Sequence, residues 1–161
     1  KVKQVYTIGG MASGIAHSAK RRVFTVVNRP GLKKEMAKLG LETEMYYQGP
    51  PSISSFLLWV ARSRGIDGIS LWQEMPFYLA TVGDWRATKT MVELLDKGLE
   101  LHAGADGLDK EANSQESRLE LLRQRSSEID VFIKRLESGG ELTQDEVQKL
   151  AGEVAEFLST S

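Results

Sequence analysis

The sequence predicts an α/β fold, a three-layer sandwich with a mixed, mostly parallel sheet and a C-terminal helical hairpin. Short apolar runs rich in β-branched residues alternate with amphipathic segments of helical period, and glycines mark the joins between them. This alternation is typical of βαβ units, in which helices cover both faces of a sheet. Near the end of the chain, two stripes of three-four spacing indicate a pair of antiparallel helices.

The first half of the chain predicts strands and helices in turn. Residues 2–8 mix β-branched and aromatic side chains and stop at Gly9-Gly10, which predicts a strand and then a turn. The following segments are predicted as a strand at 23–27, a helix at 32–39, a strand at 43–47, a helix at 52–64 and a strand at 66–72. Gly40 and Gly65 stand where the two helices are expected to end.

From residue 110 onward the sequence predicts helices without strands. Apolar residues recur three and four apart over 119–136, with one polar gap at Ser126, and Gly139-Gly140 interrupts the series. Thr143 and Glu146 have the spacing of a capping box, which predicts the start of a second helix with its own apolar stripe over 147–157. We therefore expect an α/β core at 1–109, and helices at 110–161 that pack on the core or on a neighbouring subunit.

Composition excludes several classes of function. The 161 residues carry 21 basic and 22 acidic side chains, a net charge of −1, so no broad field attracts nucleic acid or an anionic membrane. The absence of cysteine excludes disulfides and thiolate metal sites and fits a cytoplasmic protein. No apolar run reaches the roughly 18–20 residues of a membrane span. The two histidines are isolated in sequence, so we expect no metal, no cofactor and no catalytic triad.

Three places are candidates for ligand binding, each with a simpler structural interpretation. Gly9 and Gly10 follow a strand, where backbone N–H groups can surround an anion, although turn formation alone explains them. Gly49, Ser52 and Ser54 lie where a strand passes into a helix, a common position for anions, although serine is also a frequent helix cap. Glu74 follows the strand at 66–72 and has the chemistry of a general base or a ribose-binding carboxylate.

Aromatic and aliphatic side chains near these places indicate contacts between subunits or core packing. We assign candidate interface roles to a set from the strand at 66–72, the turn after it and the first C-terminal stripe: Trp72, Phe77, Tyr78, Ile129, Ile133 and Leu136. Packing inside the domain is the alternative for each of them.

Several short motifs, taken in their order, resemble the proteasome assembly chaperone family. They are Tyr-Gln-Gly-Pro-Pro-Ser-Ile-Ser at 47–54, Ala-Arg-Ser-Arg-Gly-Ile at 61–66, Gly-Ile-Ser-Leu-Trp at 68–72 and Met-Pro-Phe-Tyr at 75–78. The resemblance extends over most of the chain. It departs from the family at 81–85, where relatives carry Asn-Pro or Asp-Pro. It also lacks the family's N-terminal part, so we expect a truncated chain.

The resemblance implies a phosphorylase-like α/β sandwich and a role in protein assembly. We therefore expect a non-enzymatic, self-associating, protein-binding factor, with a proteasome-related protein among the implied partners. The alternative is an enzyme or sensor that binds a small anion or a nucleotide at residues 49–55, near Glu74. The sequence leaves enzymatic activity open and favours a non-enzymatic role.

Overall fold

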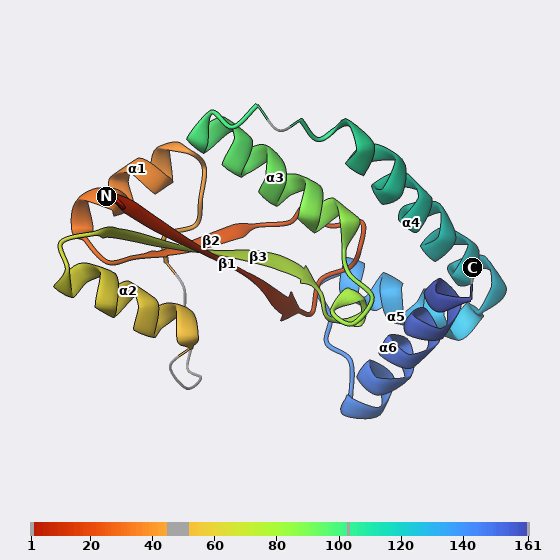
Figure 1. Cartoon of the computed structure of the whole chain (residues 1–161). Coiled ribbons are helices and arrows are strands. Elements are labelled where there is room, and N and C mark those ends of the chain that lie inside the picture. Colours follow the sequence, from red (N-terminus) through yellow and green to blue (C-terminus); the bar gives the residue numbers. More distant parts are fainter. Residues whose placement is uncertain (1, 45–51, 103, 161) are drawn as a thin grey trace. The chain divides into compact units, whose positions relative to one another are not determined.

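A computed structural model describes residues 2–44, 52–102 and 104–160 of the chain (Figure 1). Its elements, in chain order, are β1 (Gln4–Ser13), β2 (Val23–Val27), α1 (Pro30–Lys38), α2 (Ile53–Ser63), β3 (Asp67–Pro76), η1 (Phe77–Leu79), α3 (Trp85–Leu99), α4 (Asp106–Arg125), α5 (Ser127–Glu137) and α6 (Gln144–Ser159). They form two compact units. The first contains Lys1–Met11 and Arg22–Glu74, and the second contains Ala12–Arg21 and Met75–Ser161.

The first unit is built on a mixed three-stranded sheet with the order β1-β3-β2. Strand β2 runs antiparallel to β3, with Val23 opposite Gln73. Strand β1 runs parallel to β3, because the paired positions keep a nearly constant offset. The amide of Asp67 donates to the carbonyl of Lys3, and the Thr7 and Ser70 hydroxyls lie 2.8 Å apart. The predicted α/β class and the mixed sheet are confirmed.

Three details of the predicted sheet differ. Gly9-Gly10 is not a turn, since β1 continues through it to Ser13. A side chain does not fit at Gly9, because an added Cβ would lie 2.9 Å from the ring of Trp72 on the neighbouring strand. Strand β2 is antiparallel to β3, and its parallel pairing is limited to one isolated bridge between Phe24 and Glu42. Of the strand expected at 43–47, residues 43 and 44 are not strand, and the remainder lies outside the described residues.

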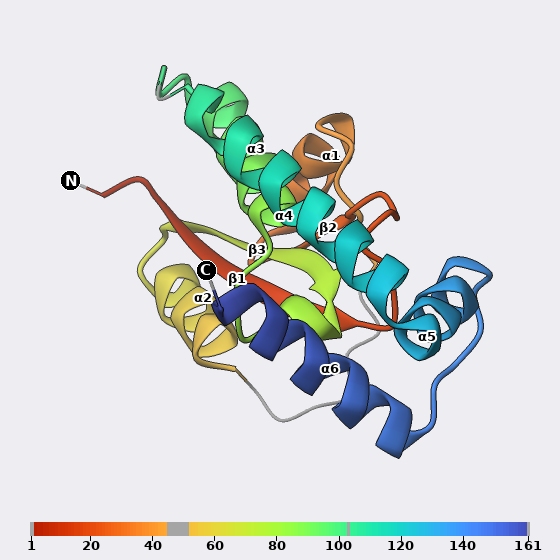
Figure 2. The same cartoon turned by 90° about the vertical axis from the view of Figure 1, so that its right-hand side faces the viewer.

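Helices α1 and α2 lie on opposite sides of these strands (Figures 1 and 2). Ser52 caps α2 by accepting a hydrogen bond from the amide of Ser55, so the predicted helix start is confirmed. The inner side of α2 is held close to β3: a Cβ at Gly68 would lie 2.6 Å from the Leu58 side chain. Only glycine lets the helix approach the strand this closely.

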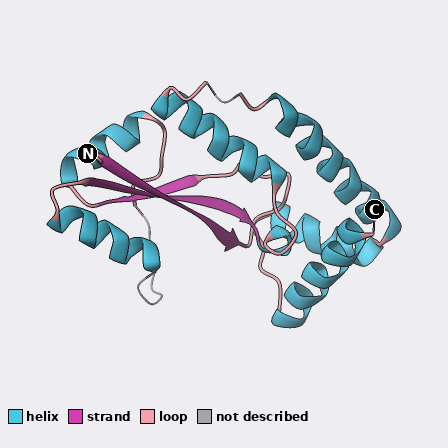
Figure 3. Cartoon of the chain, in the orientation of Figure 1, coloured by secondary structure: helices cyan, strands magenta, loops and turns pink. Residues whose placement is uncertain are grey.

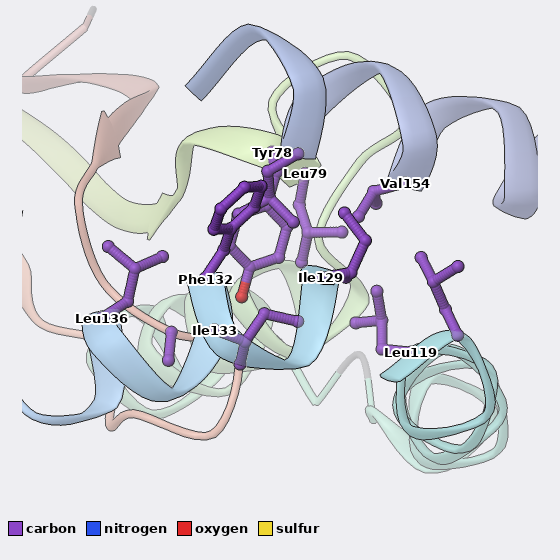
Figure 4. Close-up of a cluster of buried hydrophobic side chains, with 11 residues drawn as sticks. Tyr78, Leu79, Leu119, Ile129, Phe132, Ile133, Leu136 and Val154 are labelled. Carbon is purple, nitrogen blue, oxygen red and sulfur yellow. The ribbon is translucent and has the colours of Figure 1, made fainter. Parts of the chain in front are cut away.

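Between Phe77 and Ser159, the regular elements that the structure describes in the second unit are all helices (Figure 3). Side chains from η1, α4, α5 and α6 converge on one apolar core (Figure 4). Members of this core include Tyr78, Leu119, Ile129, Ile133, Leu136, Leu150 and Val154. Both predicted stripes therefore contribute buried side chains to a common core.

The single seam expected over 119–136 is instead two helices. Ser126 ends α4 and caps α5, whose Ile129 amide donates to its hydroxyl. The polar gap is thus a helix break, which lets the two halves of the stripe approach the core in different directions. Helices α4 to α6 share their core with η1 and with Ala16, two segments from earlier in the chain. The division of the chain at residue 109 stays a prediction.

The predicted capping box is present at the start of α6. The Thr143 hydroxyl accepts from the Glu146 amide, and the Glu146 carboxylate accepts from the Thr143 amide at 2.8 Å. We expect Thr143→Ala to lower the free energy of unfolding by about 1 kcal/mol, since a helix N–H loses its acceptor. Urea denaturation measures the change. The neighbouring exposed Gln144→Ala is the control, and an equal loss in both variants would contradict the capping role.

Candidate functional site

The outer side of α2 exposes large apolar side chains. Ile53 is 79% exposed, Trp59 65%, Phe56 58% and Leu57 43%. The inner side, with Leu58 and Ala61, is buried. Large apolar side chains on a helix are normally covered, so this exposure needs an explanation. We refer to Ile53, Phe56, Leu57, Trp59 and Val60 as the α2 face.

The α2 face is a continuous surface rather than a set of isolated side chains. The rings of Phe56 and Trp59 contact each other, with centroids 6.0 Å apart and planes tilted by 31°. Residues 52–64 contain no acidic side chain, whereas Arg62 and Arg64 are exposed at the C-terminal end of the helix. The surface is therefore apolar along its length and basic at one end.

The carboxylate of Glu74, the candidate base, forms a bidentate ion pair with Arg22 within the first unit. Its carboxylate oxygens accept from Nε and Nη2 of Arg22 at 2.9 and 2.8 Å. The Glu74 side chain is buried, and its amide also donates to the Arg22 carbonyl. This geometry joins the residue before β2 to the end of β3.

An ion pair with both side chains buried lies in the second unit. Nε of Arg21 donates to Oδ2 of Asp84 at 3.0 Å, and the same carboxylate caps α3 by accepting from the Ala87 amide. The Arg21 guanidinium also donates to the carbonyls of His17 and Ala19. Each charged group thus has several partners, which is the condition under which a buried ion pair is tolerated.

His17 is buried beside this pair and contacts two further groups. The Tyr78 hydroxyl accepts from the His17 amide at 2.6 Å and lies 2.9 Å from Nδ1, while Nε2 lies 3.2 Å from the Glu120 carboxylate. A neutral imidazole protonated on Nε2 satisfies all of these contacts at once. Burial lowers the pKa of His17 below its usual 6.5, although Glu120 acts in the opposite direction.

This pKa shift predicts a dependence of stability on pH. Because the folded imidazole resists protonation, the unfolded chain takes up the proton first as the pH falls through about 6.5. The free energy of unfolding should therefore decrease between pH 6.5 and the lower folded pKa, and be fully restored above 6.5. His17→Gln should reduce the slope, whereas the exposed His102→Asn should not. Equal slopes in all three proteins, measured by urea denaturation, would contradict the assignment.

Two cavities lie near these groups in the second unit. The one that borders His17, Arg21 and Asp84 has a volume of about 10 Å³, which is room for about one water molecule. A more open groove of about 300 Å³ is lined by the turn before α3, α4 and the end of α6. Its Arg118 donates to the carbonyls of Phe157 and Leu158, so this side chain is occupied in holding α6.

The ligand-binding residues expected from the sequence are not gathered into one described pocket. Gly49 lies outside the described residues, and Gly9 and Gly10 are within β1. The Ser52 hydroxyl is used as the α2 cap, and Ser54 is half-buried in the first turn. Across residues 2–44, 52–102 and 104–160, no cluster of three or more metal-ligating side chains is found.

The candidate interface residues fall into two groups. Tyr78, Ile129, Ile133 and Leu136 are covered by their own chain, with exposed fractions of 6% or less, and they belong to the second unit's core. Trp72 and Phe77 are half-buried. The packing alternative therefore describes the first group.

The sequence analysis did not identify the α2 face. The signal was the run Phe-Leu-Leu-Trp-Val-Ala at 56–61, which is apolar on more than one side of a helix. The spacing of apolar residues alone does not show which side of such a helix is covered, so the exposed side chains are identified only by the structure.

Comparison with known proteins identifies related folds. The sequence profile of the PAC2 family matches residues 1–123. PbaA of Pyrococcus furiosus, an archaeal homolog of proteasome-assembly chaperone, is 27% identical with a TM-score of 0.59, over 83% of this chain and 54% of PbaA. PbaB of the same organism, an archaeal proteasome activator, is 25% identical with a TM-score of 0.57, over 76% and 50%.

A protein of unknown function from Corynebacterium glutamicum shares the fold, with a TM-score of 0.75, 17% identity and coverage of 86% and 50%. The chain thus spans about half the length of the solved structures it matches. No curated protein is similar enough to match. Among the helices that the structure describes, none is both long and apolar enough to cross a membrane.

Proposed function

The chain belongs to the PAC2 family, and from this premise we propose that it is a non-enzymatic, protein-binding factor of the assembly-chaperone type. The resemblance to PbaA, at 27% identity, supports a chaperone-like role. A proteasome-related protein is one class of partner within this proposal, by analogy with PbaA and PbaB. A cytoplasmic location is also part of the proposal.

The observation that carries the proposal is the exposed α2 face. Large exposed apolar patches on a folded protein mark sites where another molecule binds. Tryptophan is also among the residues that contribute most to protein–protein binding, and Trp59 is two-thirds exposed on this face. A protein partner gives this surface the cover that an apolar helix requires.

The arrangement of the buried polar groups supports a non-enzymatic role. Glu74, Asp84 and His17 each contact groups that hold neighbouring segments together. The cavity beside His17 and Asp84 has no room for a substrate. These residues therefore act in stability rather than in chemistry under this proposal.

Self-association is a further part of the proposal, and we assign it to a different surface. Strand β1 forms one edge of the described sheet, and an edge strand offers unpaired backbone groups to another chain. Its Ile8 side chain is 54% exposed. A second copy that pairs along β1 would extend the sheet and leave the α2 face free.

Purification from the native cells, followed by sedimentation velocity, tests the proposed function. We expect the chain to co-purify with a protein identified by mass spectrometry, and Phe56→Ala/Trp59→Ala to lose that protein. Val131→Ala, which alters an exposed apolar residue on α5, is the matched control. A strict monomer without any protein partner would overturn the proposal.

A further inference from the structure

We propose that residues 14–21 form a pH-sensitive latch on the second unit, which the neutral form of His17 holds closed and its protonated form opens. These residues connect β1 to β2 without forming a helix or a strand. Contacts nevertheless group Ala12–Arg21 with the second unit, whereas β2 belongs to the first. The latch does not involve the α2 face.

Buried and polar side chains attach the latch to the second unit. Ala16 is an apolar anchor, because its side chain is buried in the core formed by η1, α4, α5 and α6. Three further side chains form hydrogen bonds or ion pairs with this unit: His17 with Tyr78 and Glu120, Ser18 with Glu137, and Arg21 with Asp84. Of these three, His17 is the group whose charge changes near neutral pH.

The Tyr78 hydroxyl selects the neutral form of His17 in the closed latch. Its oxygen accepts from the His17 amide at 2.6 Å, which leaves its own proton for Nδ1 of the ring, 2.9 Å away. Burial raises the pKa of Tyr78, so the hydroxyl keeps this proton. Nδ1 therefore acts as an acceptor, and the ring carries its proton on Nε2, which faces the Glu120 carboxylate at 3.2 Å.

Protonation of Nδ1 removes this hydrogen bond. The ring N–H and the backbone N–H of His17 would then both face the Tyr78 oxygen, and the hydroxyl proton would lose the acceptor that it contacts. His17 is 3% exposed and Tyr78 is 0% exposed, so water does not replace the lost bond while the latch is closed. In the open latch the ring is solvated and takes up its second proton without this cost.

The charges around His17 do not offset the cost of protonation. Arg21 donates to the His17 carbonyl, and Arg123 donates to the same Glu120 oxygen that Nε2 contacts. The Glu120 side chain is 48% exposed, so solvent weakens its attraction for a charged ring. Other charged groups on the surrounding elements are paired: Asp84 with Arg21, Glu116 with Arg86, and Glu137 with Arg123. Burial therefore outweighs Glu120, and the pKa of His17 lies below its usual 6.5.

Hydrogen exchange of single amides, measured by NMR on the intact chain, tests the latch. The His17 amide reports opening, since it is bonded to the Tyr78 hydroxyl, and the Ile133 amide within α5 reports unfolding of the core. Protection factors are corrected for the intrinsic pH dependence of exchange. Below pH 6.5, the factor for the His17 amide should fall by up to about tenfold for each pH unit, because the open latch takes up the proton first. The fall should stop at the lower pKa of the closed latch.

Low concentrations of urea separate opening of the latch from unfolding of the whole unit. Local opening exposes little surface, so the protection of the His17 amide should not change with urea, whereas that of the Ile133 amide should decrease. If the His17 amide loses protection only together with Ile133, and with the same urea dependence, the latch does not open by itself and the proposal is overturned. A His17 protection factor that is constant between about pH 7 and about pH 5 also overturns it.

Three variants assign the pH dependence to His17. His17→Gln keeps an acceptor and a donor but does not titrate, so protection of the amide at position 17 should no longer depend on pH. Glu120→Gln removes the carboxylate that raises the pKa of His17, so protection should fall further and down to a lower pH. The exposed His102→Asn is the control and should leave the profile unchanged. A dependence that persists in His17→Gln, or is unaltered in Glu120→Gln, would overturn the proposal. The unsubstituted chain gives both profiles by itself, so a variant that fails to fold leaves the test intact.

Discussion

Replacing Ile133 by aspartate is expected to unfold the second unit. The Ile133 side chain is 0% exposed and packs in the core formed by η1, α4, α5 and α6 (Figure 4). The substitution removes apolar contacts and buries a carboxylate with no partner, at a cost of about 4–5 kcal/mol. That is a large share of the roughly 5–15 kcal/mol that stabilises a typical domain. Urea denaturation followed by helical circular dichroism measures this decrease in the free energy of unfolding, as a shift of the transition to a lower urea concentration.

Val131→Asp is the matched control for this prediction. Val131 lies two residues away on the same helix, and its side chain is 52% exposed. It introduces the same charge without burying it, so we expect a change within about 0.5 kcal/mol. Similar losses in the two variants would contradict the assignment of Ile133 to the core.

Asp84→Ala is expected to have the second largest effect. Arg21 and Asp84 have side chains that are 3% and 0% exposed, so the substitution leaves a buried guanidinium without its anion. Breaking a buried pair in this way costs about 3–5 kcal/mol. The α3 cap is lost as well, because Oδ1 of Asp84 accepts from the Ala87 amide. We therefore expect a large decrease in the free energy of unfolding, measured in urea.

Asp84→Asn separates the two contributions. The amide oxygen retains an acceptor for the α3 cap while the charge is removed, so its loss should be smaller than that of the alanine variant. Glu128→Gln, which breaks an exposed ion pair with Lys149, should leave stability within experimental error. An asparagine variant as unstable as the alanine variant would assign the whole effect to charge rather than to capping.

Local signals in the sequence predicted most of the helix boundaries. Ser52 caps α2, and the Thr143–Glu146 box starts α6, because both depend on hydrogen bonds within one turn of helix. Gly65 and Gly139 adopt positive φ after their helices, as glycine at a helix end usually does. Interactions of this range are fully contained in a few neighbouring residues.

The differences arise where distant residues decide the local structure. Gly9 is in a strand because Trp72, far along the chain, packs over it. Ser126 is a helix break rather than a gap in a seam, since α4 and α5 must reach the same core from different directions. The pairing of β2 with β3 is likewise a long-range choice, which alternation of elements alone does not determine.

The candidate site shows the same division between local and distant information. Glu74 has the residue type of a catalytic base, but its partner Arg22 lies 52 positions earlier and was not visible in the local motif. The sequence shows the α2 face as an apolar run, but the run does not show which of its side chains are exposed. Burial of one side and exposure of the other is a property of the folded unit.

Photo-crosslinking from the α2 face in the native cells tests the central claim most directly. A benzophenone amino acid at position 56 should crosslink to a single other protein. The same probe at position 131 should not capture that protein, because Val131 lies on the exposed side of α5 in the other unit. Crosslinks from position 56 only to lipid, or only to a second copy of the chain, would contradict the account.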